Sequence, residues 1–277
     1  MPQQTIVITG ASDGVGAAAA RQLAARGEKL VLVGRSPAKT AAVAAQLGVP
    51  HFVADFADLA QVRVLADRLR EACPRIDVLA NNAGGIMGDR AVTRDGFEKT
   101  FQVNHLAPFL LTNLLLPTLI ASRAKVIQTS SVVAKQFGRF DIDDLQNEKD
   151  YRPHVAYGNG KLANILFTRE LHRRYHAQGI NAAAFHPGVV RSAFASDTTH
   201  FVRFIYHTPL RYLLTISPDK GADQLVWLAE GAPGADWQSG EYYEKRKVAA
   251  SSDDARDPAL ARKLWDRSAA LLSITTR

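Results

Sequence analysis

A tyrosine and a lysine stand four residues apart, at positions 157 and 161, and their types suit proton transfer. On a helix, residues at this spacing lie on one face, so the ammonium of Lys161 would lie beside the phenol of Tyr157. A phenol titrates near ~10 and exchanges protons poorly at neutral pH, whereas a neighbouring cation favours the phenolate and lowers the pKa. The pair is therefore a candidate general acid–base, although two such residues more often mark only a helix face.

The surrounding segments predict the sheet and helices that must position this pair. Continuous apolar strands separated by helices indicate a parallel sheet covered on both faces, which is a doubly wound, Rossmann-type α/β fold in a single domain spanning residues 1–277. Strands are expected at Thr5–Thr9, Lys29–Val33, His51–Ala54, Val78–Asn81, Lys125–Thr129 and Asn181–Phe185, and helices at Ala17–Arg26, Pro37–Leu47, Leu59–Ala72, Gly96–Ile120, Tyr157–Ala177 and Asp257–Leu272.

Composition indicates a folded protein of a reducing compartment. The chain has 277 residues, 47% of them hydrophobic, which is enough for a core and excludes disorder. Cys73 is the only cysteine, so no intrachain disulfide can form and a cytoplasmic location is expected. The longest apolar run, near Phe109–Ile120, is interrupted by polar residues and Pro117, and strand-like sequence begins at Thr5. We therefore expect neither a transmembrane segment nor a signal peptide.

The net charge of +7 is spread along the chain, with Lys245–Lys247 as its tight cluster. No helix-turn-helix, zinc or RNA-binding motif accompanies it, so neither nucleic acid nor a metal is an expected ligand. A solvated basic surface that attracts anionic phosphates is the better interpretation.

Glycines follow the first predicted strand at positions 10, 14 and 16, where the first helix begins. Glycine allows a tight turn and close approach of the backbone to a pyrophosphate, whose charge the helix N-terminus attracts. Glycines in turns usually have no further role, but this junction of a doubly wound sheet is where dinucleotides bind. The expected contacts are Gly10, Ser12, Asp13, Gly14, Val15 and Gly16.

The end of the second strand favours NADP over NAD. An acidic residue there would bind the ribose hydroxyls of NAD, but the sequence has Gly34–Ser36. Arg35 offers a planar donor fork for a 2′-phosphate and Lys39 could assist, although a surface arginine in a loop is the simpler alternative. After the third strand, Asp55 either accepts from the adenine amino group, beside Phe56, or caps the next helix.

Further motifs follow in order along the chain, each at a strand end. They are Asn81-Asn82-Ala83-Gly84, the paired serines Ser130 and Ser131, Tyr157-x-x-x-Lys161 and Pro187-Gly188. Together with the glycine turn, this set resembles the short-chain dehydrogenase/reductase family from about Thr5 to Ser192. The stretches Phe101–Leu106, Lys161–Thr168, His186–Val190 and Gly240–Tyr243, and the long connection from Ser131 to Tyr157, resemble its retinol-dehydrogenase-like branch.

The resemblance implies a catalytic tetrad of Asn104, Ser131, Tyr157 and Lys161. Ser131, the second serine of its pair, would bind the substrate oxygen, and Tyr157 would exchange the proton. Lys161 would lower the pKa of Tyr157 and bind the nicotinamide ribose, while Asn104 would hold a water that links Lys161 to solvent. The hydride belongs to the nicotinamide. The resemblance also implies cofactor contacts from Asn82, Ala83 and Gly84 on the adenosine side and from Pro187, Gly188, Val190 and Ser192 at the nicotinamide.

The chain departs from this branch at two positions. Gly160 stands before the catalytic lysine where the branch usually has Ser, and Ser192 stands where it usually has Thr. Glycine at 160 weakens the helix by about 1 kcal/mol relative to Ala. Neither change removes a member of the tetrad, so activity is still expected.

The aromatic and basic segment at about 193–217 is expected to fold over the site as a small C-terminal lid. Its aromatic residues indicate an apolar pocket for a lipid-like or aromatic ketone, aldehyde or secondary alcohol. An ordinary core or a subunit contact explains the same residues nearly as well, and docking on a membrane surface is a weaker alternative.

The sequence thus favours an NADP-dependent oxidoreductase acting on carbonyls or alcohols. The alternative is a non-catalytic NADP-binding sensor or scaffold, against which the complete tetrad argues. A light-dependent reductase of a chlorophyll precursor shares the motifs, but it would be expected to have an active-site cysteine, and Cys73 precedes the fourth strand. The family often pairs through the helices that carry Asn104 and Tyr157, which implies a homodimer or homotetramer.

Overall fold

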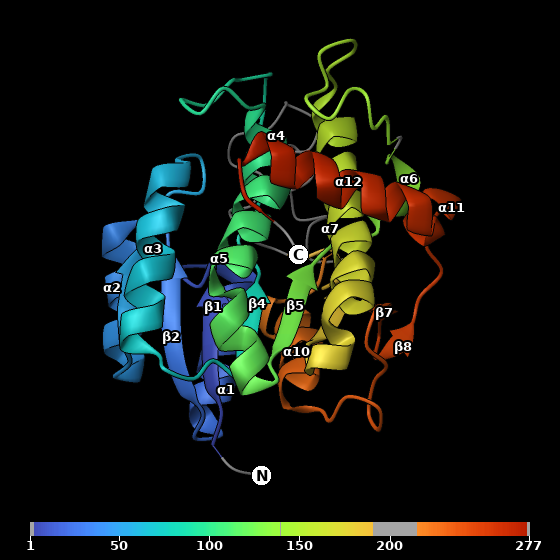
Figure 1. Cartoon of the computed structure of the whole chain (residues 1–277). Coiled ribbons are helices and arrows are strands. Elements are labelled where there is room, and N and C mark those ends of the chain that lie inside the picture. Colours follow the sequence, from blue (N-terminus) through green and yellow to red (C-terminus); the bar gives the residue numbers. More distant parts are fainter. Residues whose placement is uncertain (1–2, 139, 191–214, 276–277) are drawn as a thin grey trace.

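An eight-stranded sheet with the order β3-β2-β1-β4-β5-β6-β7-β8 forms the centre of the computed structural model, which describes residues 3–138, 140–190 and 215–275 (Figure 1). Neighbouring strands are parallel except β7 and β8, which pair antiparallel at one edge. The predicted doubly wound α/β fold is confirmed, with a hairpin added at that edge. The strands are β1 (Thr5–Thr9), β2 (Lys29–Gly34), β3 (His51–Val53), β4 (Val78–Asn81), β5 (Lys125–Thr129), β6 (Asn181–Phe185), β7 (Glu241–Glu244) and β8 (Lys247–Val248).

The inner strands form because their residues are apolar or β-branched and both faces of the sheet are covered. In β1, Ile6, Val7 and Ile8 are fully buried. The register of β1 pairs Thr5 with Lys29 on β2, and β1 also pairs with β4 on its other side. Burial of consecutive residues in this way is typical of a parallel sheet between two layers of helices.

Helices cover the sheet on both faces (Figure 1). Those that pack on one face are α3, α5 and α7, with α12 lying across α7, and those on the other are α1, α2 and α10. The helices are α1 (Gly14–Ala25), α2 (Pro37–Leu47), α3 (Leu59–Ala72), α4 (Lys99–Phe101), α5 (Ala107–Ser122), α6 (Val133–Gln136), α7 (Pro153–Tyr175), α10 (Pro218–Glu230), α11 (Asp253–Arg256) and α12 (Pro258–Leu271).

Helix α12 packs its aromatic residue into the layer formed by α5 and α7. Trp265 is only 1% exposed, and its ring centroid lies 4.9 Å from that of Phe109 and 5.5 Å from that of Phe167. His105 adds a hydrogen bond to Ser268 of α12 at 2.8 Å. A helix of the chain itself therefore covers part of the layer through which pairing with a second copy is expected.

The predicted helix Gly96–Ile120 is interrupted by a π-helical turn, η1 (Gln102–Leu106), between α4 and α5. Asn104 lies at the centre of this turn, and its carboxamide bonds to the backbone of Gly85 in the loop after β4. Such turns are rare and occur frequently at functional sites.

One helical run within the described residues, Lys99–Ser122, is long and apolar enough to cross a membrane, which the interrupted apolar run of the sequence did not lead us to expect. The mean hydropathy of its most apolar window is 1.4, and 61% of that window is buried inside the molecule. Within the fold, α5 packs against α3, and η1 packs against α7. The run thus has the surroundings of a core helix.

The predicted lid lies almost wholly outside the described residues. Where the chain is described again, Ile216 donates from its backbone to Val189 O at 2.8 Å. The segment just before α10 is thus bonded to the segment that follows β6.

Candidate active site

A cavity of about 570 Å³ opens at the carboxyl ends of β1, β2, β4, β5 and β6. Ligands of doubly wound sheets bind at this edge. Two predicted site residues, Gly16 and Asn104, do not line the cavity, and Ser192 lies outside the described residues. The predicted residues that do line it are Gly10, Ser12, Asp13, Gly14, Val15, Arg35, Ser36, Lys39, Asp55, Phe56, Asn82, Ala83, Gly84, Ser131, Tyr157, Lys161, Pro187, Gly188 and Val190.

Helix α7 presents Tyr157 and Lys161 to this cavity, one turn apart as their spacing predicts. The Lys161 ammonium lies 5.5 Å from the centroid of the Tyr157 ring. It donates to Thr129 O at 3.0 Å, which fixes it at the end of β5. Burial lowers the pKa of Lys161 to about 7. A lysine that titrates near neutral pH can stabilise a phenolate and can also pass on a proton.

The two serines after β5 have different surroundings. Ser130 is 1% exposed, and its Oγ donates to Lys161 O at 2.7 Å, so it ties β5 to α7. Ser131 is 8% exposed, and its Oγ accepts from Val133 N at 3.3 Å. A hydroxyl that accepts one hydrogen bond keeps its own proton to donate. Ser131 is thus the better placed of the two to bind a substrate oxygen.

Asn104 is fully buried behind the cavity wall. Its Nδ2 donates to Gly85 O and to Thr100 O, each at 2.8 Å. Its Oδ1 accepts from Gly85 N at 3.1 Å. These bonds fix the orientation of the carboxamide, and both its oxygen and the ammonium of Lys161 lie close to Gly84. The η1 turn therefore holds an oriented amide next to the lysine.

The glycine turn after β1 contains close approaches that a side chain would prevent. Gly10 has a φ of 66°, and a Cβ there would lie 2.8 Å from Ala83 Cα. A Cβ on Gly16 would lie 2.3 Å from Gly10 O, so this residue packs the turn rather than lining the cavity. The packing brings the N-terminus of α1, capped by Asp13, to the cavity rim. The turn has the open backbone and the helix dipole that a pyrophosphate requires.

The cavity rim at the end of β2 is basic. A Cβ on Gly34 would lie 2.2 Å from Thr40 Oγ1, so this position has no room for a side chain. Arg35 and Lys39 are exposed and line the cavity, and Lys39 pairs with Asp13 at 3.3 Å. A rim with two cationic donors and no side chain at position 34 suits a 2′-phosphate.

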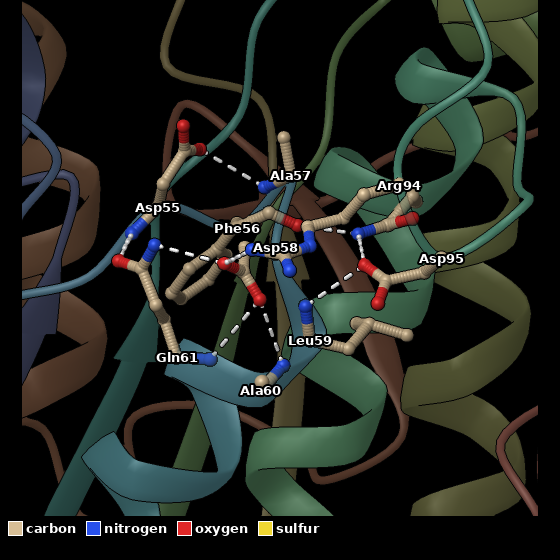
Figure 2. A network of polar contacts seen from close by, with 10 residues as sticks. Asp55, Phe56, Ala57, Asp58, Leu59, Ala60, Gln61, Arg94 and Asp95 are labelled. Atoms are coloured by element: carbon tan, nitrogen blue, oxygen red, sulfur yellow. Dashed lines mark hydrogen bonds and ion pairs between the residues drawn. The ribbon is translucent and has the colours of Figure 1, made fainter.

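A network of polar contacts shapes the loop between β3 and α3 that carries Asp55 and Phe56 (Figure 2). Asp58 caps α3 and accepts from Ala60 N at 3.0 Å. Asp55 Oδ1 accepts instead from Ala57 N at 2.9 Å. The alternative role of Asp55 as the helix cap is therefore wrong.

The same network reaches the π-helical turn. Asp95 accepts from Leu59 N at 2.9 Å (Figure 2) and from Gln102 Nε2 at 2.8 Å. Gln102 also donates to Phe56 O at 3.1 Å. Gln102, two positions before Asn104, thus bonds to the loop between β3 and α3 at the opposite end of the cavity.

Asn82 holds three strands together through its side chain. Its Nδ2 donates to Thr9 O at 3.1 Å, and its Oδ1 accepts from Thr129 Oγ1 at 3.1 Å. Both ends of the amide are therefore engaged within the protein. The neighbouring backbone of Ala83 and Gly84 lines the cavity as well and is better placed for a ligand.

The sequence did not single out the apolar part of the cavity wall. It consists of residues in the loop after β4 and at the start of α6 after β5, which closely follow the Asn-Ala-Gly motif and the serine pair. In the sequence, these wall residues could have been found only by their position next to the recognised motifs. These residues are Ile86, Met87, Val132 and Val133.

Comparison with known proteins adds independent findings. Residues 4–202 match the model of a family described as short chain dehydrogenase. A Streptomyces protein (strain C5) named as a daunorubicin C-13 ketoreductase is 43% identical over 284 residues, covering 100% of this chain and 95% of the relative. Human retinol dehydrogenase 13 is 38% identical over 285 residues, covering 99% of this chain and 86% of the relative. A solved Pseudomonas aeruginosa RhlG/NADP active-site complex has a TM-score of 0.69 at 26% identity, covering 86% of this chain and 93% of that one.

Proposed function

The chain belongs to the short-chain dehydrogenase family, in its retinol-dehydrogenase-like branch, and on this premise we propose that it is an NADP-dependent oxidoreductase interconverting a carbonyl and an alcohol. One observation carries the proposal. Tyr157, Lys161 and Ser131 line the same cavity as the glycine turn, although they come from different elements. A sensor or scaffold that only bound the cofactor would not need this arrangement of a proton donor, a cation and a hydroxyl.

The roles of these residues follow from their positions. Bound nicotinamide supplies or accepts the hydride. In reduction, Tyr157 donates its phenolic proton to the carbonyl oxygen as the alcohol forms, and in oxidation it removes that proton. Ser131 donates a hydrogen bond to the same oxygen and stabilises the negative charge that develops on it. Lys161, held by Thr129 O, stabilises the phenolate that Tyr157 becomes.

The choice of NADP over NAD rests on the rim at β2. Position 34 has no room for an acidic side chain, and Arg35 and Lys39 offer a 2′-phosphate positive charge. No carboxylate follows β2 directly, where NAD would require one. The RhlG structure, with NADP at its active site, agrees with this choice.

A hydrophobic substrate is supported by the apolar wall at the catalytic end of the cavity. Ile86, Met87, Val132 and Val133 line that wall, and no charged side chain lies among them. The two relatives are named for reactions of a ketone and of an alcohol. We propose a lipid-like or aromatic ketone, aldehyde or secondary alcohol as the substrate class.

We further propose a cytoplasmic protein with no membrane-spanning segment, in which Lys99–Ser122 is a core helix. Cys73, the only cysteine, is buried at the end of α3, before β4, and is thus remote from the carboxyl ends of the strands. This position counts against a reductase that uses an active-site cysteine.

Because α12 lies across α7, we propose that pairing of two copies through the layer of α5 and α7 is restricted.

The direct test is to follow NADPH oxidation with aldehydes and ketones graded in size and polarity. NADH in place of NADPH forms the parallel series. We expect turnover with apolar carbonyls, and more efficient turnover with NADPH. Tight NADPH binding without turnover of any carbonyl or alcohol would instead support the sensor or scaffold alternative.

A further inference from the structure

The residue that directly follows β6 is a buried histidine that the proposed mechanism does not use. His186 is only 8% exposed, and it lines the same cavity as Ser131 and Tyr157. Its backbone N–H donates to Tyr243 O at 2.9 Å, so the pairing with β7 continues through this residue. The imidazole is therefore held at the catalytic end of the cavity.

Alternation along β6 places the side chain of His186 on the face of the sheet that α7 covers. Ala184, two residues earlier, packs in the core shared with α7, whereas Phe185 packs in the core on the α10 side. In the register of β5 and β6, Phe185 pairs with Thr129. The next residues, Ser130 and His186, are therefore neighbours across the two strands, and Ser130 Oγ bonds to the backbone of α7. Both side chains thus face the catalytic helix.

One nitrogen of the His186 ring remains for a ligand. Nδ1 is buried and has no hydrogen-bond partner among the described residues. Burial lowers the pKa of His186, so the ring is neutral at pH 7 and carries one N–H. A proton on Nδ1 would be a buried donor without an acceptor, so we assign the proton to Nε2. Since Nδ1 is shielded, Nε2 is also the nitrogen that can reach the cavity.

The hydroxyl donors at this end of the cavity already have uses among the described residues. Ser130 Oγ donates to the backbone of α7, and Thr129 Oγ1 donates to Asn82 Oδ1 at 3.1 Å. Ser131 and Tyr157 serve the reacting oxygen in the proposed function. A further oxygen of the substrate would therefore find its side-chain donor in the imidazole.

We propose that His186 determines substrate specificity by donating a hydrogen bond from Nε2 to a second, neutral oxygen of the substrate. This inference rests on the proposed function and deepens it, since it narrows the substrate to a ketone or aldehyde with a hydroxyl or carbonyl group one or two carbons from the reacting carbon. Ser131 and His186 follow neighbouring strands, which are about 4.8 Å apart. Oxygens on carbons that are adjacent, or separated by one carbon, suit donors at this separation. A neutral donor suits a neutral oxygen, whereas a carboxylate is bound more strongly by a cation.

The test compares propiophenone with its 2-hydroxy and 3-hydroxy derivatives, which differ from it by one oxygen. The wild type should have a higher kcat/KM for at least one hydroxy ketone than for propiophenone. His186→Phe keeps a ring without an N–H and should lower this ratio by about 10–100-fold, with little change in kcat/KM for propiophenone or in NADPH affinity. His186→Gln places an amide N–H near the position of Nε2 and should restore part of the ratio. His51→Phe, at an exposed histidine of β3 that does not line the cavity, is the matched control and should keep the ratio.

Three results would overturn the inference. The first is an unchanged ratio in His186→Phe. The second is weaker NADPH binding in that variant, measured by fluorescence titration, with the ratio unchanged, because the imidazole would then serve the cofactor. The third is an equal loss of kcat/KM for all three ketones, because His186 would then position the catalytic groups without contacting the second oxygen.

Binding measurements separate this inference from the proposed function. If the wild type turns over none of the ketones, calorimetry measures their binding to the complex with NADP. Tighter binding of a hydroxy ketone that is lost in His186→Phe would support the recognition by His186 while the proposed function fails, and equal binding would overturn the recognition as well. Circular dichroism would identify a variant that does not fold. His186→Asn, whose amide is too short to reach the position of Nε2, then replaces His186→Phe with the same expected result.

Discussion

The two ends of the cavity hold their side chains in different ways. At the end of β2, the charged groups Arg35 and Lys39 are exposed on the rim. At the catalytic end, Tyr157 and Lys161 are 7% and 2% exposed, and the lysine is bonded to the backbone of β5. Exposed charges contribute modestly because solvent screens them, whereas buried polar groups depend strongly on their partners. Changes on the rim should therefore alter cofactor binding modestly, and changes at the catalytic end should alter turnover strongly.

Tyr157→Phe should have the largest effect, because it removes only the hydroxyl that we propose exchanges the proton. We expect kcat to fall by about 10³-fold, with little change in NADPH affinity, since the ring still fills its place beside Lys161. Steady-state kinetics and fluorescence titration with NADPH measure the two quantities. Retained turnover would show that another group supplies the proton and that the catalytic end has been assigned wrongly.

The serine pair tests whether neighbouring residues at this end can be told apart. Ser131→Ala should lower kcat by about 10²-fold, as expected for loss of one donor to a developing oxyanion. Ser130→Ala should mainly lower the free energy of unfolding, by about 1–3 kcal/mol, because it removes the buried bond to Lys161 O. Kinetics and chemical denaturation distinguish these results. The reverse pattern would make Ser130 the substrate-binding serine.

Arg35→Ala should have the smallest effect of the three. Loss of an exposed contact to a 2′-phosphate should weaken NADPH binding by about 10-fold, leave NADH binding nearly unchanged, and alter kcat little. Arg68, an exposed arginine on α3 that does not line the cavity, provides the control Arg68→Ala with the same change in net charge. An equal loss of NADPH affinity in both variants would mean that overall charge, and not a specific contact, favours NADP.

Features set by local sequence were predictable to the residue. Helix α2 runs from Pro37 to Leu47 as predicted, because Ser36 caps its start and Gly48 ends it in the left-handed region. The meeting of Ser131 and the glycine turn at one edge could also be predicted, because each directly follows a parallel strand.

Features that depend on distant contacts were not predictable. The π-helical turn is associated with the bonds of Asn104 to Gly85, and β7 pairs with β6 between segments far apart in the chain. In the sequence, the preference for Ser131 over Ser130 rests on resemblance alone. The structure supplies a physical reason for it in the bond from Ser130 to Lys161 O.

The position of α12 has a consequence for the order in which the chain can fold during synthesis. Leu264 and Trp265 of this helix belong to the same hydrophobic core as residues of α3, α5 and α7, and Leu272 O accepts from Arg63 at 3.0 Å. Domains fold as units while the chain is being synthesised, and synthesis proceeds at about 5–20 residues per second. This core cannot be closed until the segment up to residue 272 has left the exit tunnel. The nascent chain therefore exposes the apolar outer side of α5 and α7 from the time that α7 has been made until α12 follows, and exposed apolar surface of this kind is what chaperones bind.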